Sequence, residues 1–380
     1  MICRPLVTNV VTLVKGELSR SLFFRFDKGE NMKALVYRGP GKKEWTEVPN
    51  PVIEEPTDVI VRVDTTTICG TDLHILKGDV PAVKEGTILG HEAVGTITEV
   101  GAGVTKFSPG DRVVIPAITS CGTCSYCRVG RASHCQSVGG IGWILGHLVD
   151  GTQAEYVRVP FGETSLHRVP DGLSDEEVIF LSDIIPTGYE MGVLNGDVKA
   201  GDDVLIIGAG PVGLAAMLTA KLAGAKRVIA ADLDVYRLQE AKNNFGATHV
   251  VNSGDSDWYQ QVRDLTGGTG PDVVMEAVGI PATLEAAFEL VKPYGNVANI
   301  GVHGAPVTLP IDRMWIENIT LTMGLVDGVS APTLIGLVED GILNVKPMGT
   351  HDFKMDEFME AYDVFSNAGS NKAIKVIVRR

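Results

Sequence analysis

A glycine motif between an apolar run and a helical stretch constrains this chain more than any other feature. Residues 203–207 are typical of a short buried strand, and residues 211–222 of a helix that begins within the glycine motif. Gly208 permits the tight turn between them, Gly210 lets the backbone approach a ligand, and Gly213 lets the helix pack closely on the strand. The free N–H groups at the start of the helix attract phosphate. The pattern predicts a dinucleotide-binding turn made of Gly208, Ala209, Gly210, Pro211, Val212 and Gly213.

An acidic residue follows at the distance that such a turn requires. Asp232 comes nineteen residues after Gly213, at the end of the next predicted strand. A carboxylate there can accept hydrogen bonds from both ribose hydroxyls of an adenosine. By itself Asp232 could be a turn residue, but the strand, the helix and the acid together predict NAD as the cofactor.

The hydrophobic pattern divides the chain into four parts. In residues 32–184, short β-branched runs alternate with turn signals, which predicts a barrel-like β domain. In residues 185–325, strands and helices alternate, which predicts a doubly wound parallel sheet. Residues 326–380 carry two helical stretches and a last strand, and we assign them to a segment that returns to the first domain. Residues 1–31 read as an N-terminal extension, either disordered or a targeting segment.

Charge and hydropathy exclude two classes of partner. The chain has 33 Lys and Arg against 47 Asp and Glu, a net charge of −14, which opposes binding to nucleic-acid phosphates. No apolar run approaches the roughly 18 residues of a membrane helix, so we expect no membrane partner. We expect a cytoplasmic protein, or a mitochondrial one if residues 1–31 are a transit peptide.

Four of the six cysteines lie within fifteen residues of one another. This crowding favours a metal site over disulfides and indicates a reducing compartment. Four thiolates complete a tetrahedral shell around Zn²⁺ and leave no open position, so the role of this zinc is structural. The alternatives are a redox cluster and a nucleic-acid-binding zinc module, the second of which the acidic charge opposes. The four ligands are Cys121, Cys124, Cys127 and Cys135.

A second group of metal-ligand residues is scattered along the chain. Cys69 precedes a short polar segment, His91 and Glu92 are adjacent, and Asp183 lies just before the predicted parallel sheet. Taken alone, Cys69 could be a small core residue, His91 and Glu92 a surface pair, and Asp183 a turn residue.

Together the motifs resemble the zinc-containing medium-chain alcohol dehydrogenases along residues 32–380. The resemblance implies a GroES-like catalytic domain, a Rossmann domain and an active site between them. It is closest to the tetrameric bacterial secondary-alcohol and formaldehyde-dehydrogenase-like branch, which implies a homo-oligomer, with a tetramer favoured over a dimer. The shared motifs are Cys69-x-Thr71-Asp72-x-His74, Gly90-His91-Glu92, the four-cysteine spacing, and the glycine motif with its acid, in this order.

By this resemblance Cys69, His91 and Asp183 are ligands of a second, catalytic zinc, and Glu92 is a transient or resting-state ligand. The thiolate of Cys69 and the carboxylate of Asp183 neutralise the charge of Zn²⁺, and the fourth coordination position of the metal stays open. Zinc lowers the pKa of a bound water from 15.7 to about 7, and we expect it to acidify an alcohol similarly. A hydride would then pass from the zinc-bound alkoxide to the nicotinamide.

The resemblance also implies roles around this zinc. Thr71 would take the proton of the alcohol, which reaches His74 through the cofactor ribose. Asp72 would hold the ring of His91.

Further residues are assigned to the cofactor and the substrate in the same way. Arg237 would lie near the adenosine ribose, and Lys375 near the pyrophosphate. Gly301 and Val302 would contact the nicotinamide carboxamide through their backbone, with ordinary strand-end packing as the alternative. Trp143 would form a wall of the substrate site, with a core position as the alternative.

We therefore expect a zinc-dependent, NAD-linked oxidoreductase that interconverts primary or secondary alcohols and aldehydes or ketones. The alternative is a polyol or amino-alcohol dehydrogenase of the sorbitol or threonine type, although such members usually place glutamate at the position of Asp183. Two departures from the family pattern stand out. Gly70 replaces an arginine of some members, and the long insertion of dismutating formaldehyde dehydrogenases is absent, which lowers the expectation of that activity. A nucleotide-binding redox sensor would show a damaged open zinc site, and this one is intact.

Overall fold

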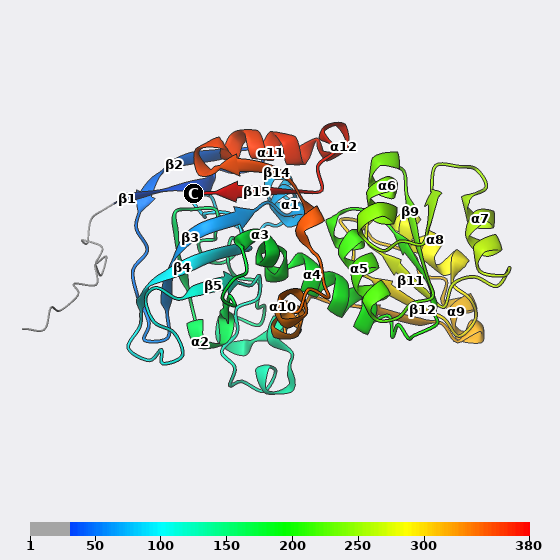
Figure 1. Cartoon of the computed structure of the whole chain (residues 1–380), viewed down its shortest axis with the longest axis horizontal. Helices are drawn as coiled ribbons and strands as arrows, with labels where there is room; N and C mark the ends of the chain where they lie inside the picture. Colours follow the sequence, from blue (N-terminus) through cyan, green and yellow to red (C-terminus); the bar gives the residue numbers. More distant parts are fainter. Residues whose placement is uncertain (1–30) are drawn as a thin grey trace, which may run out of the picture.

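The computed structural model describes residues 31–380 (Figure 1). The expectation for an N-terminal extension falls on residues 1–30, which lie outside the described residues, and Asn31 already belongs to the first strand. Within the described part of the chain, no helix is long and apolar enough to span a membrane.

One half of the molecule is built on a seven-stranded, mainly antiparallel sheet in the order β14-β15-β3-β4-β5-β7, with β6 also paired to β3. Its central strand β3 is rich in valine and threonine, β-branched residues that pack well on a pleated surface. The strands are β3 (Val59–Thr67), β4 (Ala93–Val100), β5 (Arg112–Ile115), β6 (Tyr156–Val159), β7 (His167–Arg168), β14 (Gly349–Lys354) and β15 (Lys375–Arg379). A separate hairpin joins β1 (Asn31–Tyr37) to β2 (Lys43–Pro49).

The C-terminal strand β15 also belongs to this sheet. In β15, Ile377 lies opposite Thr67 of β3, so the last strand pairs with an early one (Figure 1). The helices of this half are short, with four to nine residues each. They are α1 (Gly70–Lys77), α2 (Gly162–Ser165), α3 (Asp175–Val178), α4 (Ile184–Thr187), α10 (Ala331–Glu339), α11 (Phe358–Ser366) and α12 (Ala368–Asn371).

The other half is a six-stranded parallel sheet in the order β10-β9-β8-β11-β12-β13. Counted along the chain within this sheet, the order is 3-2-1-4-5-6, the doubly wound arrangement of dinucleotide-binding folds. The predicted Rossmann and GroES-like fold class is therefore confirmed. The strands are β8 (Asp203–Ile207), β9 (Arg227–Asp232), β10 (His249–Asn252), β11 (Val273–Glu276), β12 (Asn296–Asn299) and β13 (Thr320–Met323).

Helices on this sheet agree with the sequence pattern. The helix predicted over residues 211–222 is α5 (Pro211–Leu222), with Pro at the first turn, where its missing N–H costs nothing. Asp234 caps the next helix by accepting a hydrogen bond from the Tyr236 backbone N–H. The others are α6 (Val235–Asn244), α7 (Trp258–Leu265), α8 (Pro281–Leu290) and α9 (Ile311–Glu317).

A continuous apolar core joins the two halves. One cluster of buried side chains includes Val94 of β4, Phe180 and Ile184 of the connecting segment, and Val204 of β8. The connecting helix α4 therefore lies between the sheets, as Figure 1 shows. A side chain at the start of α4 is consequently held between them.

Candidate active site

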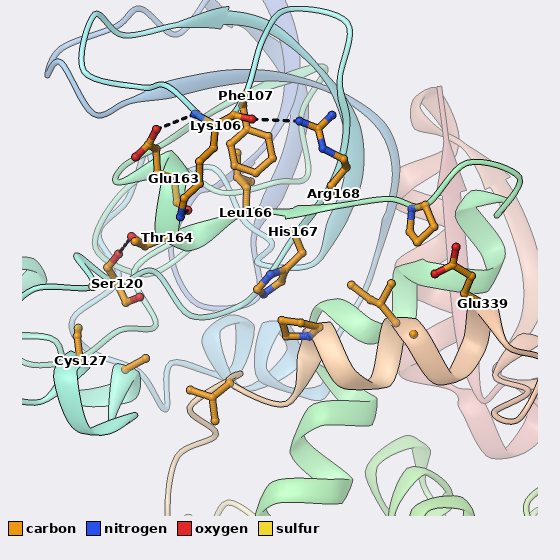
Figure 2. Close-up of a pocket in the computed structure, with 17 residues that line it drawn as sticks. Lys106, Phe107, Ser120, Cys127, Glu163, Thr164, Leu166, His167, Arg168 and Glu339 are labelled. Carbon is orange, nitrogen blue, oxygen red and sulfur yellow. Dashed lines mark hydrogen bonds between the residues drawn. The ribbon is translucent and has the colours of Figure 1, made fainter.

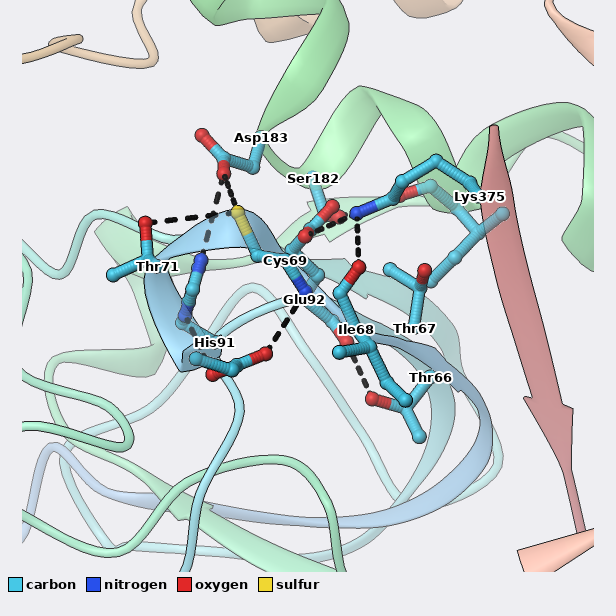
Figure 3. A network of polar contacts seen from close by, with 12 residues as sticks. Thr66, Thr67, Ile68, Cys69, Thr71, His91, Glu92, Ser182, Asp183 and Lys375 are labelled. Carbon is cyan, nitrogen blue, oxygen red and sulfur yellow. Dashed lines mark hydrogen bonds and ion pairs between the residues drawn. The ribbon is translucent and has the colours of Figure 1, made fainter. Parts of the chain in front are cut away.

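Two groups of side chains have donor atoms close enough to share a metal ion. One consists of Cys69, His91, Glu92 and Asp183, and the other of the four clustered cysteines. Within each group the donor atoms lie within 4.8 Å of one another. The structure thus brings together the residues that sequence reasoning assigned to two zinc sites, and Figure 3 shows the first group.

The spacing of the first group fits zinc. The Asp183 Oδ2 lies 3.8 Å from the Cys69 Sγ and 3.5 Å from the His91 Nε2. Tetrahedral zinc with Zn–S near 2.3 Å and Zn–N or Zn–O near 2.1 Å separates its ligand atoms by about 3.4–3.8 Å. Because Glu92 is paired with Lys375, three ligands remain, and three protein ligands are the donor set of a catalytic zinc.

Local backbone structure positions each of the three ligands. Cys69 follows β3 and is the N-cap residue of α1, where its backbone N–H donates to the Asp72 Oδ2 at 2.9 Å. His91 follows Gly90, whose φ of +93° favours glycine. Asp183 precedes α4, and its Oδ1 accepts a hydrogen bond from the Thr187 hydroxyl at 2.8 Å. The ligands therefore come from both sides of the junction between the two halves.

Asp72 faces the rear of the His91 ring, and its role in holding that ring stays a prediction. The His91 Nδ1 lies 3.9 Å from the Asp72 Oδ1, and both atoms are buried with no hydrogen-bond partner among the described residues. The Nε2 on the other side of the ring is thereby left to face the ligand cluster. A carboxylate behind a metal-binding imidazole fixes its tautomer and orientation.

The charges of the site favour a cation at its centre. Burial lowers the pKa of His91, but its contacts with Asp183 and Cys69 outweigh burial and raise the pKa well above its ordinary value. For Asp183, burial raises the pKa, and the contact with His91 outweighs it, so the pKa is lowered. The same anionic surroundings that attract a proton to His91 would attract Zn²⁺ in its place.

Glu92 and Lys375 form a buried ion pair beside these ligands. The Lys375 Nζ lies 2.7 Å from the Glu92 Oε1 and donates to the Ile68 carbonyl at 2.9 Å (Figure 3). The ammonium therefore points to Glu92 in this structure and not to the glycine turn. Lys375 nevertheless borders the cavity that contains Gly210, so its contact with the pyrophosphate stays a prediction. The Glu92 Oε2 is buried without a partner among the described residues, so its role as an occasional ligand also stays a prediction.

The two members of the expected proton path lie on α1. The Thr71 Oγ1 is 3.6 Å from the Cys69 Sγ, next to the metal ligands. His74 lies one turn further along the helix, is partly exposed, and its Nδ1 is 2.9 Å from the Asp79 Oδ2. Both residues line the same cavity as Cys69. Thr71 and the partly exposed His74 thus border one cavity, and the passage of a proton between them stays a prediction.

The four clustered cysteines also fit a tetrahedral zinc. The Cys127 Sγ lies 4.0 Å from the Cys121 Sγ and 3.4 Å from the Cys124 Sγ. Burial raises the pKa of Cys121, but hydrogen bonds from Ser137 and Thr123 outweigh it and lower the pKa to about 5. Burial and the neighbouring Cys124 raise the pKa of Cys127 to about 12. Four thiols this close cannot all ionise by themselves, and a bound Zn²⁺ would remove this conflict.

A cavity of about 420 Å³ connects the catalytic ligands with the glycine turn. It is lined by Cys69 and Thr71 on one side and by Gly210 and Pro211 on the other. Gly301 and Val302, the predicted carboxamide contacts, line it as well. A neighbouring cavity of about 540 Å³ shares Gly210, Arg237, Ala277 and Val278 with the first. The two cavities together have the extended form that a dinucleotide needs.

The glycine turn has the geometry that the motif predicted. A Cβ on Gly213 would lie 1.8 Å from the Gly208 carbonyl oxygen, so only glycine fits there. Gly208 has a φ of +102°. A Cβ on Gly210 would meet only the Arg237 side chain, at 3.9 Å, which leaves room for a phosphate. Val212 lies in the first turn of α5.

Asp232 and Arg237 border the second cavity. The Asp232 carboxylate accepts hydrogen bonds from the backbone N–H groups of Ala209 at 2.6 Å and Asp234 at 2.8 Å. The glycine turn and the acid therefore fix each other in place. Each carboxylate oxygen keeps further lone pairs that can accept ribose hydroxyls.

Trp143 lies behind His91 and does not line the 420 Å³ cavity. Its ring meets the His91 ring edge-on with centroids 6.0 Å apart, and stacks on the His147 ring at 4.2 Å. It packs against the core clusters of both halves. Its predicted role as a wall of the substrate site stays a prediction.

Another cavity, of about 620 Å³, is lined by none of the residues expected to bind the catalytic zinc or NAD (Figure 2). Its lining includes Cys127 of the cysteine cluster but none of the catalytic residues predicted from the sequence. Its cations already have partners, since Lys106 donates to the Glu163 carbonyl and Arg168 pairs with Asp111. We therefore place the chemistry in the smaller cavity next to Cys69.

Sequence reasoning missed several buried polar residues around the site. Glu276 ends β11 and accepts hydrogen bonds from the backbone N–H groups of Val278 and Gly279, both at 2.9 Å, which shapes a loop of the cofactor cavities. Its place at the carboxyl end of a parallel strand was the available signal. Roles for Gln153 and Tyr362 were also missed: Gln153 contacts Asp72, and Tyr362 contacts Gln153, only through the tertiary fold.

Comparison with known proteins agrees with this geometry. Residues 55–171 match the family "Alcohol dehydrogenase GroES-like domain", and residues 211–338 match the family "Zinc-binding dehydrogenase". An alcohol dehydrogenase of Cupriavidus necator is 37% identical over 353 residues, which cover 88% of this chain and 95% of that protein.

Solved structures show the same fold. The apo form of zinc-dependent alcohol dehydrogenase 2 from Streptococcus pneumonia is 48% identical, with a TM-score of 0.87 over 92% of this chain and 98% of that one. Alcohol dehydrogenase TADH from Thermus sp. ATN1 is 37% identical, with a TM-score of 0.84 over 92% and 99% of the two chains. The chain therefore belongs to the zinc-dependent medium-chain alcohol dehydrogenase family and is an oxidoreductase.

Proposed function

We propose that this protein oxidises primary or secondary alcohols to aldehydes or ketones with NAD, and catalyses the reverse reaction, at the site formed by Cys69, His91 and Asp183. One observation carries the proposal: a single cavity is lined both by Cys69 and by Gly210 and Gly301. A metal ligand and the backbone of a dinucleotide site thus line the same cavity. This is where an alcohol carbon and a nicotinamide would have to meet.

Zinc held by these ligands would lower the pKa of an alcohol hydroxyl and polarise a carbonyl, while NAD would accept the hydride. The chain's own residues position the reactants and move the proton. Thr71, 3.6 Å from the Cys69 Sγ, accepts the hydroxyl proton of the alcohol. His74, paired with Asp79 near the surface, delivers it to solvent. Asp72 keeps the Nε2 of His91 turned toward the metal ligands.

The glycine turn and Asp232 orient the cofactor. Free N–H groups at the start of α5 bind the pyrophosphate, and Gly210 leaves the space for it. Asp232 accepts the adenosine ribose hydroxyls, which favours NAD over NADP. The cofactor then extends from the cavity beside Asp232 to the cavity beside Cys69, where its nicotinamide end would lie.

An activity screen tests the proposal. Purified protein with NAD is assayed on short, branched, aromatic and polyhydric alcohols, after zinc has been counted by elemental analysis. We expect two zinc ions per chain and the highest kcat/KM on a monohydric alcohol. Preference for a polyol or an amino alcohol would favour the alternative dehydrogenase class, and turnover without zinc at Cys69 would refute the mechanism.

We also propose a homotetramer in the cytoplasm. The short segment between Cys135 and Asp183 resembles the tetrameric members, and a cluster of free thiols is suited to a reducing compartment. Sedimentation analysis of the purified protein checks the assembly, and fractionation of the cells checks the compartment.

A further inference from the structure

A buried chain of polar contacts extends from the metal ligand His91 to the C-terminal helix α11. Asp72 lies behind His91, Gln153 contacts Asp72, and Tyr362 contacts Gln153. All four side chains are buried, and those of Gln153 and Tyr362 have no solvent exposure. We propose that Gln153 and Tyr362 are positioning residues of the catalytic zinc, acting through Asp72 on the orientation of His91. This inference rests on the proposed function of the site.

The direction of every hydrogen bond at Gln153 is determined by its neighbours. Its Nε2 lies 3.0 Å from the Asp72 Oδ2 and 3.3 Å from the Thr67 carbonyl oxygen, and both of these atoms only accept. Its Oε1 lies 2.8 Å from the Tyr362 hydroxyl, which therefore donates. A flipped amide would point its oxygen at two acceptors. The hydroxyl of Tyr362 consequently holds the amide in the orientation that serves Asp72.

Gln153 controls one of the two carboxylate oxygens of Asp72. The Oδ2 accepts from the Cys69 backbone N–H at 2.9 Å and from the Gln153 amide, so it has two donors. The Oδ1 has no partner except the His91 ring at 3.9 Å. Because the two donors hold the Oδ2, the plane of the carboxylate is set and the Oδ1 faces His91. Without Gln153 the carboxylate is free to rotate toward another donor.

The backbone keeps Gln153 in register with the segment that carries His91. Its N–H donates to the Leu89 carbonyl at 2.9 Å, and its carbonyl accepts from the Leu35 N–H at 2.8 Å. A Cβ on Gly90 would lie 2.5 Å from the Gln153 Cγ, so glycine before His91 makes room for the glutamine stem. The position of Gln153 is therefore fixed by its backbone hydrogen bonds and by the packing of its stem, independently of the contacts of its amide.

Zinc release tests the inference. The holoenzyme variants Gln153→Met and Tyr362→Phe keep the size of each side chain and remove its hydrogen bonds. We expect the catalytic zinc of Gln153→Met to pass to a chromogenic chelator roughly 10-fold faster than in the wild type, at the lower end of the effect of outer-shell partners. Tyr362→Phe should also release its catalytic zinc faster than the wild type, but by a smaller factor. The kcat should fall in both variants while the KM for NAD stays unchanged.

Two control variants separate positioning from general stability. Tyr37→Phe removes the hydroxyl of a buried tyrosine on β1, outside the chain of contacts. Phe358→Leu weakens packing on the same helix as Tyr362 and leaves its hydroxyl in place. We expect both to retain wild-type zinc release even where Tm falls. Cobalt exchanged into the catalytic site should show an altered visible spectrum only in Gln153→Met and Tyr362→Phe.

Wild-type release rates and cobalt spectra in Gln153→Met and Tyr362→Phe would overturn the inference, whatever their Tm. A wild-type protein that contains only the zinc of the cysteine cluster would overturn the proposed function as well. Elemental analysis of the wild type distinguishes these two outcomes.

Discussion

The Asp232 carboxylate accepts a 2.6 Å hydrogen bond from the Ala209 backbone N–H, which ties the end of β9 to the glycine turn after β8. The carboxylate is thus held rigidly at the border of the cavity beside the turn. A rigid negative charge there discriminates between a ribose hydroxyl and a ribose phosphate more strongly than a mobile one.

The first prediction is that Asp232 selects NAD over NADP. Two like charges about 4 Å apart at an effective dielectric near 20 repel by about 4 kcal/mol, close to a thousandfold in affinity. Arg237 offsets part of this repulsion, since its guanidinium lies near Gly210. We expect kcat/KM to favour NAD in the wild type and Asp232→Ser to lose most of that preference. Asp234→Asn is the matched control, because it removes a nearby charge and keeps the helix cap. An unchanged ratio in Asp232→Ser would show that another residue selects the cofactor.

The second prediction concerns the catalytic ligands. Cys69→Ser should lose more activity than the roughly 10–100-fold that outer-shell changes cost, because it removes a ligand itself. The fold should survive, since the variant leaves the cysteine cluster intact. Activity, zinc content and Tm of the purified variant check this. Near-wild-type turnover in a preparation depleted of one zinc would contradict the assignment.

The third prediction is the converse result for the cysteine cluster. Cys124→Ser should lower Tm by several degrees and weaken assembly, while the kcat of the folded fraction changes little. The physical reason is that a closed zinc site stabilises the fold and has no open position for substrate. The neighbouring change Ser125→Ala is the control, and we expect it to leave Tm unchanged. A single zinc per chain in active wild-type protein would be incompatible with this assignment.

The fourth prediction tests Trp143. If its indole limits the substrate space beside His91, Trp143→Ala should raise kcat/KM for bulky alcohols relative to ethanol. Trp143→Phe keeps an aromatic ring next to His147 and should stay closer to the wild type. Selectivity that does not change, together with a lower Tm, would identify Trp143 as a core residue that packs the two halves together.

The fifth prediction concerns pH and His167, which lies on β7 and lines the cavity in Figure 2. Burial lowers the pKa of His167 from 6.5 to about 4. Between these values the unfolded chain takes up a proton that the folded chain does not. The contribution of His167 to stability is therefore complete above pH 6.5 and is lost as the pH falls toward 4, by at most about 3 kcal/mol.

Chemical denaturation at pH 7.5 and pH 5 checks this contribution. The free energy of unfolding should fall less between the two pH values in His167→Gln than in the wild type. His134→Gln, at an exposed histidine, is the control and should retain the full fall. An identical fall in wild type and His167→Gln would mean that the folded protein accommodates the charged imidazole.

The local parts of this protein could be predicted from the sequence. Helix α5 begins and ends where the pattern predicted, because proline, glycine and apolar spacing act over a few residues. The glycine turn and the four clustered cysteines are also local motifs, and their geometry follows from short spacings. The scattered ligands Cys69, His91 and Asp183 could be assigned only through the family resemblance, since nothing in their spacing brings them together.

Only the tertiary structure decided how distant segments meet. The family resemblance assigned Lys375 to the pyrophosphate, and the fold places it in β15, where its ammonium is buried against Glu92. The sequence suggested no role for Gln153 or Tyr362. Gln153 contacts Asp72 directly, and Tyr362 reaches Gln153 because α11 packs over the first sheet. A buried polar group takes whichever partner the packed elements supply, because leaving it unpaired costs about 1–3 kcal/mol. That choice depends on contacts between residues hundreds of positions apart, which no local pattern of the sequence encodes.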